Sequence, residues 1–356
     1  MRKLRIAQIS PLIESVPPKL YGGTERVVAY LTDELVNQGH DVTLFASGDS
    51  VTRARLLPIT PEALRLKKIT DPLAFHVLQL KEVVDRANDY DILHFHTDYL
   101  HFPLSELAGL KTITTLHGRL DIEELQQLFN KFSQMPVVSI SNAQRKPMPQ
   151  ANWVGTVYHG FPKDLYRQGA GRGNYVAFIG RISPEKRVDI AIEIARQAGV
   201  KIKIAAKVDK ADEEYFQKYI KHLFNLPHVE YIGEIGENEK NDFLGNAMAL
   251  LFPIDWPEPF GLVMTEALGC GTPVIAFNRG SVPEIIEDGK TGFIVERAGQ
   301  AVEALKRIDL LDRDTCRATF ETRFSAAGMA KKYTNLYSKI LETDQSSMLE
   351  PVPVNF

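Results

Sequence analysis

The sequence predicts an α/β protein made of two Rossmann-like domains that face each other across a cleft. Its 356 residues exceed what one hydrophobic core usually supports. A hydrophobic fraction of 44% and a charged fraction of 24% are typical of globular proteins. Short β-like runs alternate with helical patterns in two successive series, and this alternation favours parallel sheets covered by helices.

The first series defines an N-terminal domain over residues 1–160. Its helical pattern over residues 24–38 ends before Gly39, a typical C-terminal stop. Four apolar side chains lie on one face of this helix: Val27, Val28, Leu31 and Leu35. The strand-like runs are residues 4–9, 41–46, 91–95, 111–116 and 136–140.

The second series defines a C-terminal domain over residues 161–325. It begins with a glycine-rich stretch, residues 163–174, whose composition is typical of a flexible connector. A last helix is expected over residues 326–342, followed by a flexible tail at 343–356. The strand-like runs are residues 175–179, 201–205, 229–232, 249–253, 273–277 and 291–295.

Charge and cysteine content exclude several classes of protein. The 42 Lys and Arg residues are balanced by 45 Asp and Glu, a net charge of −3, without the basic excess of a nucleic-acid binder. No apolar run approaches a membrane span, so we expect no integral membrane contact and at most weak peripheral association. Cys270 and Cys316 are too few for a disulfide framework and predict buried free thiols in the cytoplasm.

A cationic segment follows the first strand of the second series. Arg181, Lys186 and Arg187 lie where an open parallel sheet binds its ligands, beyond the carboxyl end of a strand. Ser183 and Pro184 predict an N-cap and first helical position, which would place Lys186 and Arg187 in the first turn. A helix start disfavours cations unless an anion lies there, so the segment favours a bound diphosphate. Solvated surface cations are the alternative.

Two carboxylates flank a predicted helix start further along the chain. Glu258 lies in the loop after a strand, and Glu266 lies about one turn inside the following helix. The amides of Phe260, Gly261 and Leu262 would point toward the same place. Carboxylates can bind sugar hydroxyls while amides meet an anion. Otherwise Glu258 is a plain loop residue and Glu266 a solvated helix residue.

Weaker signals lie in the N-terminal domain. Gly22 and Gly23 precede the first helix, which is consistent with ligand approach or with a simple turn. His117 ends a strand, so it either faces the cleft or is structural. A further group has metal-ligand character: His94, His96, Asp98 and His101. Because no partner from a second segment completes a site, we expect no metal and interpret His96 as a polar residue lining the cleft.

These motifs together resemble the family 4 retaining glycosyltransferases of the GT-B fold, over nearly the whole chain. The resemblance implies that Arg181 and Lys186 hold the diphosphate of a nucleotide sugar, and that Glu266 binds its ribose. Glu258 and the helix-start amides would bind the hexose, which His117 would contact near its 6-position. The segments that carry the resemblance are residues 22–25, 116–118, 180–186, 258–266, 271–276 and 280–286.

The resemblance extends to further donor contacts. Gly22 and Gly23 would approach the donor, and Glu234 and Ile235 would lie at the nucleobase. Lys207 stands in a segment where many members have a glycine-rich turn, and it would add a phosphate contact if the loop keeps its role. The last helix would pack back on the N-terminal domain.

The resemblance therefore implies hexosyl transfer from UDP-, GDP- or ADP-hexose to a carbohydrate or other hydroxyl acceptor. The expected catalytic residues are Glu258, His117, Arg181 and Lys186, with no metal and no cofactor besides the donor substrate. Two alternatives remain open: a GT-B sugar-nucleotide epimerase, and a non-catalytic protein that binds nucleotide sugars.

Overall fold

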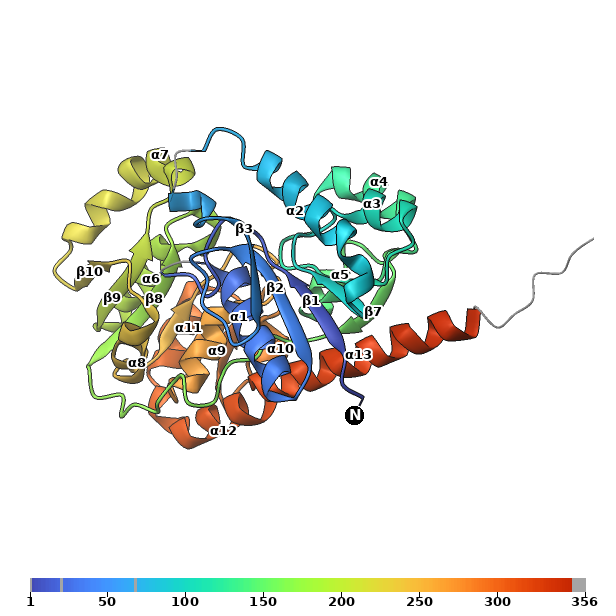
Figure 1. Cartoon of the computed structure of the whole chain (residues 1–356). Helices are drawn as coiled ribbons and strands as arrows, with labels where there is room; N and C mark the ends of the chain where they lie inside the picture. The colour runs from blue at the N-terminus through green and yellow to red at the C-terminus, as the bar shows by residue number, and fades with distance from the viewer. Residues whose placement is uncertain (1, 20–21, 67–68, 348–356) are drawn as a thin grey trace, which may run out of the picture. The chain divides into compact units, whose positions relative to one another are not determined.

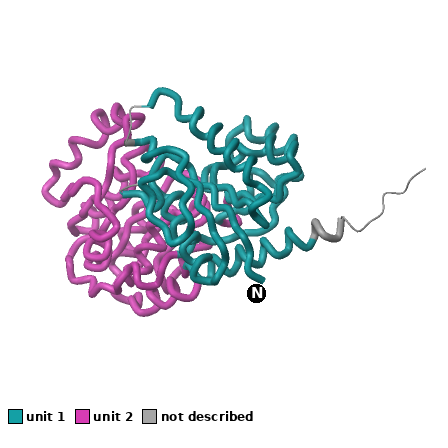
Figure 2. Tube along the Cα trace, viewed as in Figure 1, with its two compact units in different colours: residues 1–140, 145–160, 326–356 teal, residues 141–144, 161–325 magenta. Residues whose placement is uncertain are grey.

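The computed structural model describes residues 2–19, 22–66 and 69–347 of the chain. It divides into two compact units (Figure 2). Unit 1 comprises Met1–Ile140, Arg145–Gly160 and Ala326–Phe356, and unit 2 comprises Ser141–Gln144 and Phe161–Ser325. The expected tail at 343–356 lies partly in the last helix, which continues to Ser347, and residues 348–356 lie outside the described residues.

Unit 1 is built on a parallel sheet (Figure 1). The strand order β3-β2-β1-β4-β5-β6-β7 runs outward from β1 in one direction and then from β4 in the other. Every neighbouring pair is parallel. The strands are β1 (Arg5–Ile9), β2 (Asp41–Ser47), β3 (Arg55–Thr60), β4 (Ile92–Phe95), β5 (Thr112–Thr115), β6 (Val137–Ser139) and β7 (Trp153–Thr156).

Helices cover both faces of this sheet. Ala7 and Ile9 of β1 pack with Leu80 and Val83 of α2 on one face. Gln8 points to the other face, where its side chain meets Tyr337 of α13. Helix α1 begins at Gly23 and buries the predicted apolar face, which confirms its period. The helices of unit 1 are α1 (Gly23–Asn37), α2 (Leu73–Asp85), α3 (Phe102–Leu107), α4 (Glu123–Lys131) and α13 (Ala326–Ser347). All but the last residue of α5 (Asn142–Arg145) belong to unit 2.

Unit 2 repeats the same plan. Its parallel sheet has the order β10-β9-β8-β11-β12-β13, so the order reverses between β8 and β11. Apolar side chains of β8, β9 and β11 form one core with α6 and α11. The strands are β8 (Tyr175–Arg181), β9 (Lys201–Lys207), β10 (Val229–Gly233), β11 (Leu250–Phe252), β12 (Val274–Phe277) and β13 (Gly292–Val295). The helices are α6 (Val188–Ala198), α7 (Glu213–Tyr215), α8 (Glu237–Gly245), α9 (Leu262–Gly269), α10 (Val282–Ile285), α11 (Ala298–Leu305) and α12 (Arg313–Arg323).

Two parallel sheets with alternating helices confirm the predicted α/β class, and two strands were missed. β3 contains Pro58, and β7 contains Gly155, residues that weaken a strand prediction. Both strands lie at an edge of the sheet, where proline and glycine are tolerated. Among the described residues, no helix is long and apolar enough to cross a membrane.

Candidate active site

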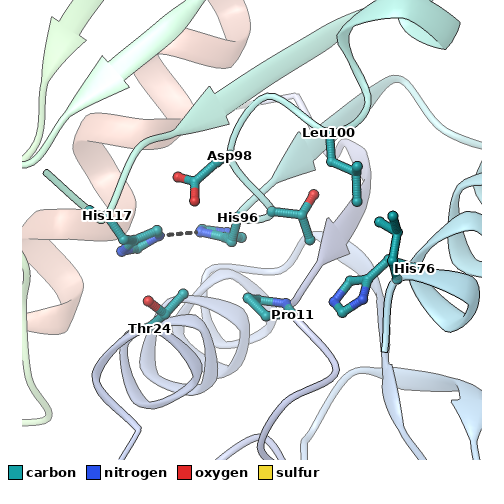
Figure 3. A pocket seen from close by; sticks show the side chains of 10 residues that line it. Pro11, Thr24, His76, His96, Asp98, Leu100 and His117 are labelled. Carbon is teal, nitrogen blue, oxygen red and sulfur yellow. Dashed lines mark hydrogen bonds between the residues drawn. The ribbon is translucent and has the colours of Figure 1, made fainter. Parts of the chain in front are cut away.

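The reversal of strand order in unit 1 carries a pocket of about 380 Å³ (Figure 3). Its walls come from the loop after β1, the start of α1 and α2, and the segments after β4 and β5. Ligands of open α/β sheets bind at such a reversal, beyond the carboxyl ends of the strands. The lining includes Pro11, Thr24, His76, His96, Asp98 and His117.

The predicted cleft residues of unit 1 meet in this pocket. Nδ1 of His96 lies 2.9 Å from Nε2 of His117, and both rings line the cavity (Figure 3). The His117 ring also stacks on His159, with ring centroids 5.3 Å apart. The backbone amide of His117 donates to the Asp98 carboxylate. His96 is therefore a polar residue that lines this pocket of unit 1.

Gly22 and Gly23 stand at the start of α1 and are not among the residues that line the pocket. Gly22 is the N-cap of α1, and Gly23 is the first residue of that helix. A Cβ atom on Gly22 would come within 2.7 Å of the Pro18 Cβ atom, so a larger residue would displace the loop. Both glycines lie in unit 1.

The remaining histidines of the metal-like group are held by other bonds. His94 lies 2.8 Å from both the Tyr337 hydroxyl and the Thr115 hydroxyl. His101 is bonded to Ser105 and Thr114. Within the described ranges, no three His, Cys, Asp or Glu side chains are arranged to hold a metal ion.

Arg181 ends β8 at the reversal of strand order in unit 2. Its guanidinium lies 2.6 Å from Glu185, 3.2 Å from Asp212 and 3.8 Å from Asp209. The side chain is about one-third exposed, so solvent and ligands can reach it. Arg181, which is predicted to bind the diphosphate, is thus surrounded by carboxylates of its own unit.

The helix expected to begin at Pro184 begins later. Pro184–Lys186 form a single 3₁₀ turn, and α6 starts at Val188. Between them Arg187 has φ 54° and ψ 48°, a left-handed conformation that a right-handed helix cannot contain. Ion pairs with Asp189 and Asp255 hold Arg187 there. The prediction that Lys186 and Arg187 share the first turn of this helix is therefore wrong.

Lys186 instead reaches the loop that follows β11. Its Nζ atom lies 2.5 Å from Oε2 of Glu258 and 5.6 Å from the centre of the Trp256 ring. The Trp256 indole nitrogen donates to the same carboxylate oxygen at 3.0 Å. The Glu258 carboxylate is therefore fixed by a cation and by a neutral donor.

The turn after Glu258 leads into α9 as predicted. Gly261 has φ 75°, a conformation that favours glycine, and α9 begins at Leu262. Phe260 is buried, and its carbonyl accepts from the Ser281 hydroxyl at 2.9 Å. The amide of Met264 donates to the Gly261 carbonyl at 3.0 Å, and the helix offers no acceptor to the amides of Leu262 and Val263 before it, which point toward an anion at this end.

Glu266 lies inside α9 and is held by a different cation. Its Oε1 atom is 2.8 Å from Nζ of Lys240, and both side chains are at least 94% buried. Lys240 also pairs with Glu237 at 3.2 Å. The structure therefore brings Glu258 to Lys186 and Glu266 to Lys240, two separate ion pairs.

The remaining predicted residues of unit 2 follow neighbouring strands. Lys207 ends β9, is 8% exposed and pairs with Asp209 at 2.9 Å. Because Arg181 also approaches Asp209, the two cations share one carboxylate. Glu234 and Ile235 follow β10, where Glu234 is exposed and Ile235 half-buried.

Two residues of this site were not predicted. Trp256 stands two positions before Glu258, and its aromatic ring was the available signal. The sequence did not indicate a role for Lys240, because a lysine among the polar residues of α8 is expected to be exposed to solvent. Its burial is visible only when α8 is packed against α9.

Comparison with known proteins places this arrangement in a family. The model for group 1 glycosyl transferases matches residues 166–328. The model for glycosyltransferase family 4 matches residues 21–161. The chain belongs to the family 4 glycosyltransferases. The matches cover both units, so this glycosyltransferase carries both halves of the fold.

Individual relatives are distant. An uncharacterized glycosyltransferase of Methanocaldococcus jannaschii is 29% identical over 194 residues, 51% of this chain and 53% of that protein. The chain thus matches about half the length of this relative. The N-acetyl-alpha-D-glucosaminyl L-malate synthase of Bacillus anthracis is 24% identical, over 92% of this chain and 97% of that protein.

Solved structures share the fold of this glycosyltransferase. The Anabaena HepE protein, crystallised with UDP and glucose, has a TM-score of 0.74 and 18% identity, over 94% of this chain and 99% of that one. At this identity the likeness establishes the GT-B fold alone. It confirms the fold class that the sequence predicts.

Proposed function

We propose that this glycosyltransferase moves a hexosyl unit from a nucleoside-diphosphate sugar to a hydroxyl acceptor with retention of anomeric configuration. The observation that supports this most is the meeting of Lys186 and Glu258 at the reversal of strand order in unit 2, beside the start of α9. A cation, a fixed carboxylate and helix-start amides are the groups that a sugar diphosphate needs.

The donor would occupy unit 2, residues 161–325. Arg181 and Lys186 would hold the diphosphate, and Lys207 would add a third positive charge from β9. Each of these cations already forms an ion pair with a carboxylate, which holds it in position. The diphosphate would bind the same cations in place of, or beside, these carboxylates. UDP, GDP and ADP are all candidates for the nucleotide, and the HepE crystals contain UDP.

The sugar and the nucleoside would lie on either side of the diphosphate. Glu258 and the amides of Phe260, Gly261 and Leu262 would bind the hexose. Glu266 would accept from the ribose hydroxyls, held in place by Lys240. Glu234 and Ile235 would border the nucleobase beyond β10. We propose Gly22, Gly23 and His117 as donor contacts from unit 1.

The chemistry would depend on stabilising the departing nucleotide. As the anomeric carbon gains positive charge, negative charge grows on the diphosphate, where Arg181 and Lys186 would meet it. Retention by double displacement needs a carboxylate nucleophile on the opposite face of the sugar. The Glu258 carboxylate is instead bound to Lys186 and Trp256, which favours attack of the acceptor on the same face as the leaving group.

The acceptor would bind in unit 1, residues 1–160, in the pocket at the ends of β1 and β4. Histidine, aspartate and threonine side chains in its lining suit a ligand with several hydroxyl groups, so we propose a carbohydrate acceptor. The helix at 326–342 would complete unit 1. Two buried free thiols are compatible with the reducing cytoplasm, where we propose that the protein works.

One assay separates this proposal from its alternatives. The purified protein is incubated with UDP-, GDP- and ADP-hexoses, with and without a panel of sugar and polyol acceptors. Nucleotide release that requires an acceptor supports transfer. Release or epimerisation without an acceptor supports an epimerase, and binding without turnover supports a non-catalytic protein. The anomeric coupling constant of the product then tests retention.

A further inference from the structure

A chain of hydrogen bonds runs beneath the pocket of unit 1 and ends at His117. Gln8 of β1 is completely buried, and its Oε1 atom lies 2.8 Å from Nε2 of His96. Nδ1 of His96 lies 2.9 Å from Nε2 of His117. At the other end, Nε2 of Gln8 donates to the Tyr337 hydroxyl of α13 at 3.2 Å.

The hydrogen bonds of the Gln8 side chain show whether its amide nitrogen or its carbonyl oxygen faces His96. The amide nitrogen of Gln8 donates to the Tyr337 hydroxyl and lies 3.3 Å from Nδ1 of His94, which is itself 2.8 Å from that hydroxyl. The carbonyl oxygen of Gln8 faces His96. Because a carbonyl oxygen can only accept, Nε2 of His96 must carry a hydrogen.

The remaining hydrogens follow in order. Desolvation lowers the pKa of His96 well below its usual value and that of His117 to about 3, so both rings are neutral. A neutral His96 that carries its hydrogen on Nε2 has a bare Nδ1, which must accept. Nε2 of His117 is then the donor to it, and Nδ1 of His117 carries no hydrogen.

That last nitrogen lacks a protein partner. Nδ1 of His117 is buried and has no hydrogen-bond partner within the described part of the chain. Leaving a buried acceptor without a partner is unfavourable, so such groups in native proteins usually bind water or a ligand. The ring lines the pocket, where a ligand would supply the missing donor.

We propose that Gln8 and His96 are positioning residues that fix His117 as the Nε2–H tautomer, so that its Nδ1 accepts a hydrogen bond from a substrate hydroxyl. His117 would then select for a donor group on the substrate and could not donate to a phosphate or carbonyl. The inference rests on the proposed function, because the hydroxyl belongs to one of its two sugar substrates.

The tautomer can be observed directly, without turnover. Long-range proton–nitrogen correlation spectra of protein labelled with ¹⁵N-histidine distinguish protonated from bare ring nitrogens. His96→Gln and His117→Gln variants assign the two rings. We expect both rings to carry hydrogen on Nε2 at neutral pH. A hydrogen on Nδ1 of His117 would overturn the inference, whether or not the protein proves to be a transferase.

Substrate analogues test the direction of the last hydrogen bond. For the hydroxyl that meets His117, the deoxy and the deoxyfluoro sugar should both lose activity by tenfold or more, because fluorine cannot donate. The matching amino sugar should retain activity. A deoxyfluoro sugar that matches the parent at every hydroxyl position would contradict an accepting Nδ1.

Substitution of Gln8 separates positioning from packing. In Gln8→Glu, a carboxylate facing Nε2 of His96 raises the pKa of that ring. The protonated ring donates from Nδ1, so Nε2 of His117 must accept and its Nδ1 gains the hydrogen. We therefore expect turnover of this variant to fall as pH is lowered and to recover as pH rises, unlike that of the parent protein.

The titratable groups around His96 do not provide this response themselves. His94, His117 and His159 all have lowered pKa values, and burial raises that of Tyr337. The Asp98 carboxylate accepts the amide of His117 rather than facing the ring of His96.

The matched controls are Gln8→Leu and Gln79→Leu. Gln8→Leu removes the acceptor, so we expect a mixed His117 tautomer and about tenfold lower turnover at every pH. Gln79 is equally buried but donates to the Ser10 carbonyl, so Gln79→Leu should leave the tautomer unchanged. Nucleotide affinity should be unchanged in all three variants. If turnover of Gln8→Glu were lowered equally at every pH, Gln8 would have only a structural role and the inference would be wrong.

Discussion

Nζ of Lys186 and Oε2 of Glu258 lie 2.5 Å apart, although 72 positions separate the two residues in the sequence. The pair joins the segment after β8 to the loop after β11, across the reversal of strand order in unit 2. Both side chains remain partly accessible, at 20% and 11% exposure. The ion pair therefore holds two groups of opposite charge where a sugar diphosphate would meet both.

Glu258→Gln should lower turnover by about 10²–10³ and leave the affinity for nucleoside diphosphates almost unchanged. The reason is that Glu258 is assigned to the hexose, which a bare diphosphate lacks. Calorimetric titration and steady-state rates measure the two effects. Loss of diphosphate affinity with normal turnover would contradict the assignment.

Glu266→Gln should have the opposite effect, weakening the affinity for nucleosides and their diphosphates. Its carboxylate is assigned to the ribose, and glutamine keeps the shape of the side chain beside Lys240. Alanine is a poorer choice, because it also removes the oxygen that accepts from Nζ of Lys240, which glutamine retains. The prediction fails if Glu266→Gln binds 2′-deoxy and ordinary nucleotides as the parent does.

Glu25→Gln should stabilise the protein at neutral pH by up to about 2 kcal/mol. Burial in α1 raises the pKa of Glu25 to about 6, above its unfolded value of 4.5. The folded state therefore holds this proton longer, and the free energy of unfolding decreases as pH rises from about 4.5 to about 6. The variant should lose this decrease, which urea unfolding at several pH values would detect. Identical pH profiles would refute the expected shift.

Initial rates should be unaffected by excess EDTA. The charge that a metal would supply is available from Arg181, Lys186 and the first amides of α9. The Asp312-Arg313-Asp314 segment, whose carboxylates resemble a metal motif, begins α12, and the Asp312 side chain accepts the amides of Asp314 and Thr315. Activity that EDTA removes and magnesium or manganese restores would contradict this prediction.

The sequence predicted most of the fold because the apolar residues of the core recur at the regular spacing of strands and helices. The run containing Gln8 and the helix at Val27–Leu35 were assigned correctly, since buried strands and amphipathic helices leave regular patterns. The edge strands β3 and β7 were missed because Pro58 and Gly155 obscure their pattern.

The candidate site was predicted less completely, for reasons of local conformation and packing. The left-handed Arg187 depends on ion pairs to Asp189 and Asp255, which sequence periodicity does not reveal. The connector expected to be flexible is instead fixed, with the amides of Gly169 and Gly171 bonded to the carbonyls of Cys270 and Gly245. Such contacts join distant segments and become visible only in three dimensions.

The proposed function depends most on the binding of a diphosphate by Arg181, Lys186 and Lys207 of unit 2, and nucleotide titration tests this binding directly. UDP, GDP and ADP are titrated into the parent protein, Arg181→Ala, Lys186→Ala and the exposed control Arg196→Ala, and each is compared with its monophosphate. We expect one diphosphate to bind the parent more tightly than its monophosphate. Both site variants should bind that diphosphate about tenfold or more weakly than the parent does, and the control should bind it as the parent does. Equal affinity of the diphosphate for the parent and both site variants would contradict diphosphate binding by Arg181 and Lys186.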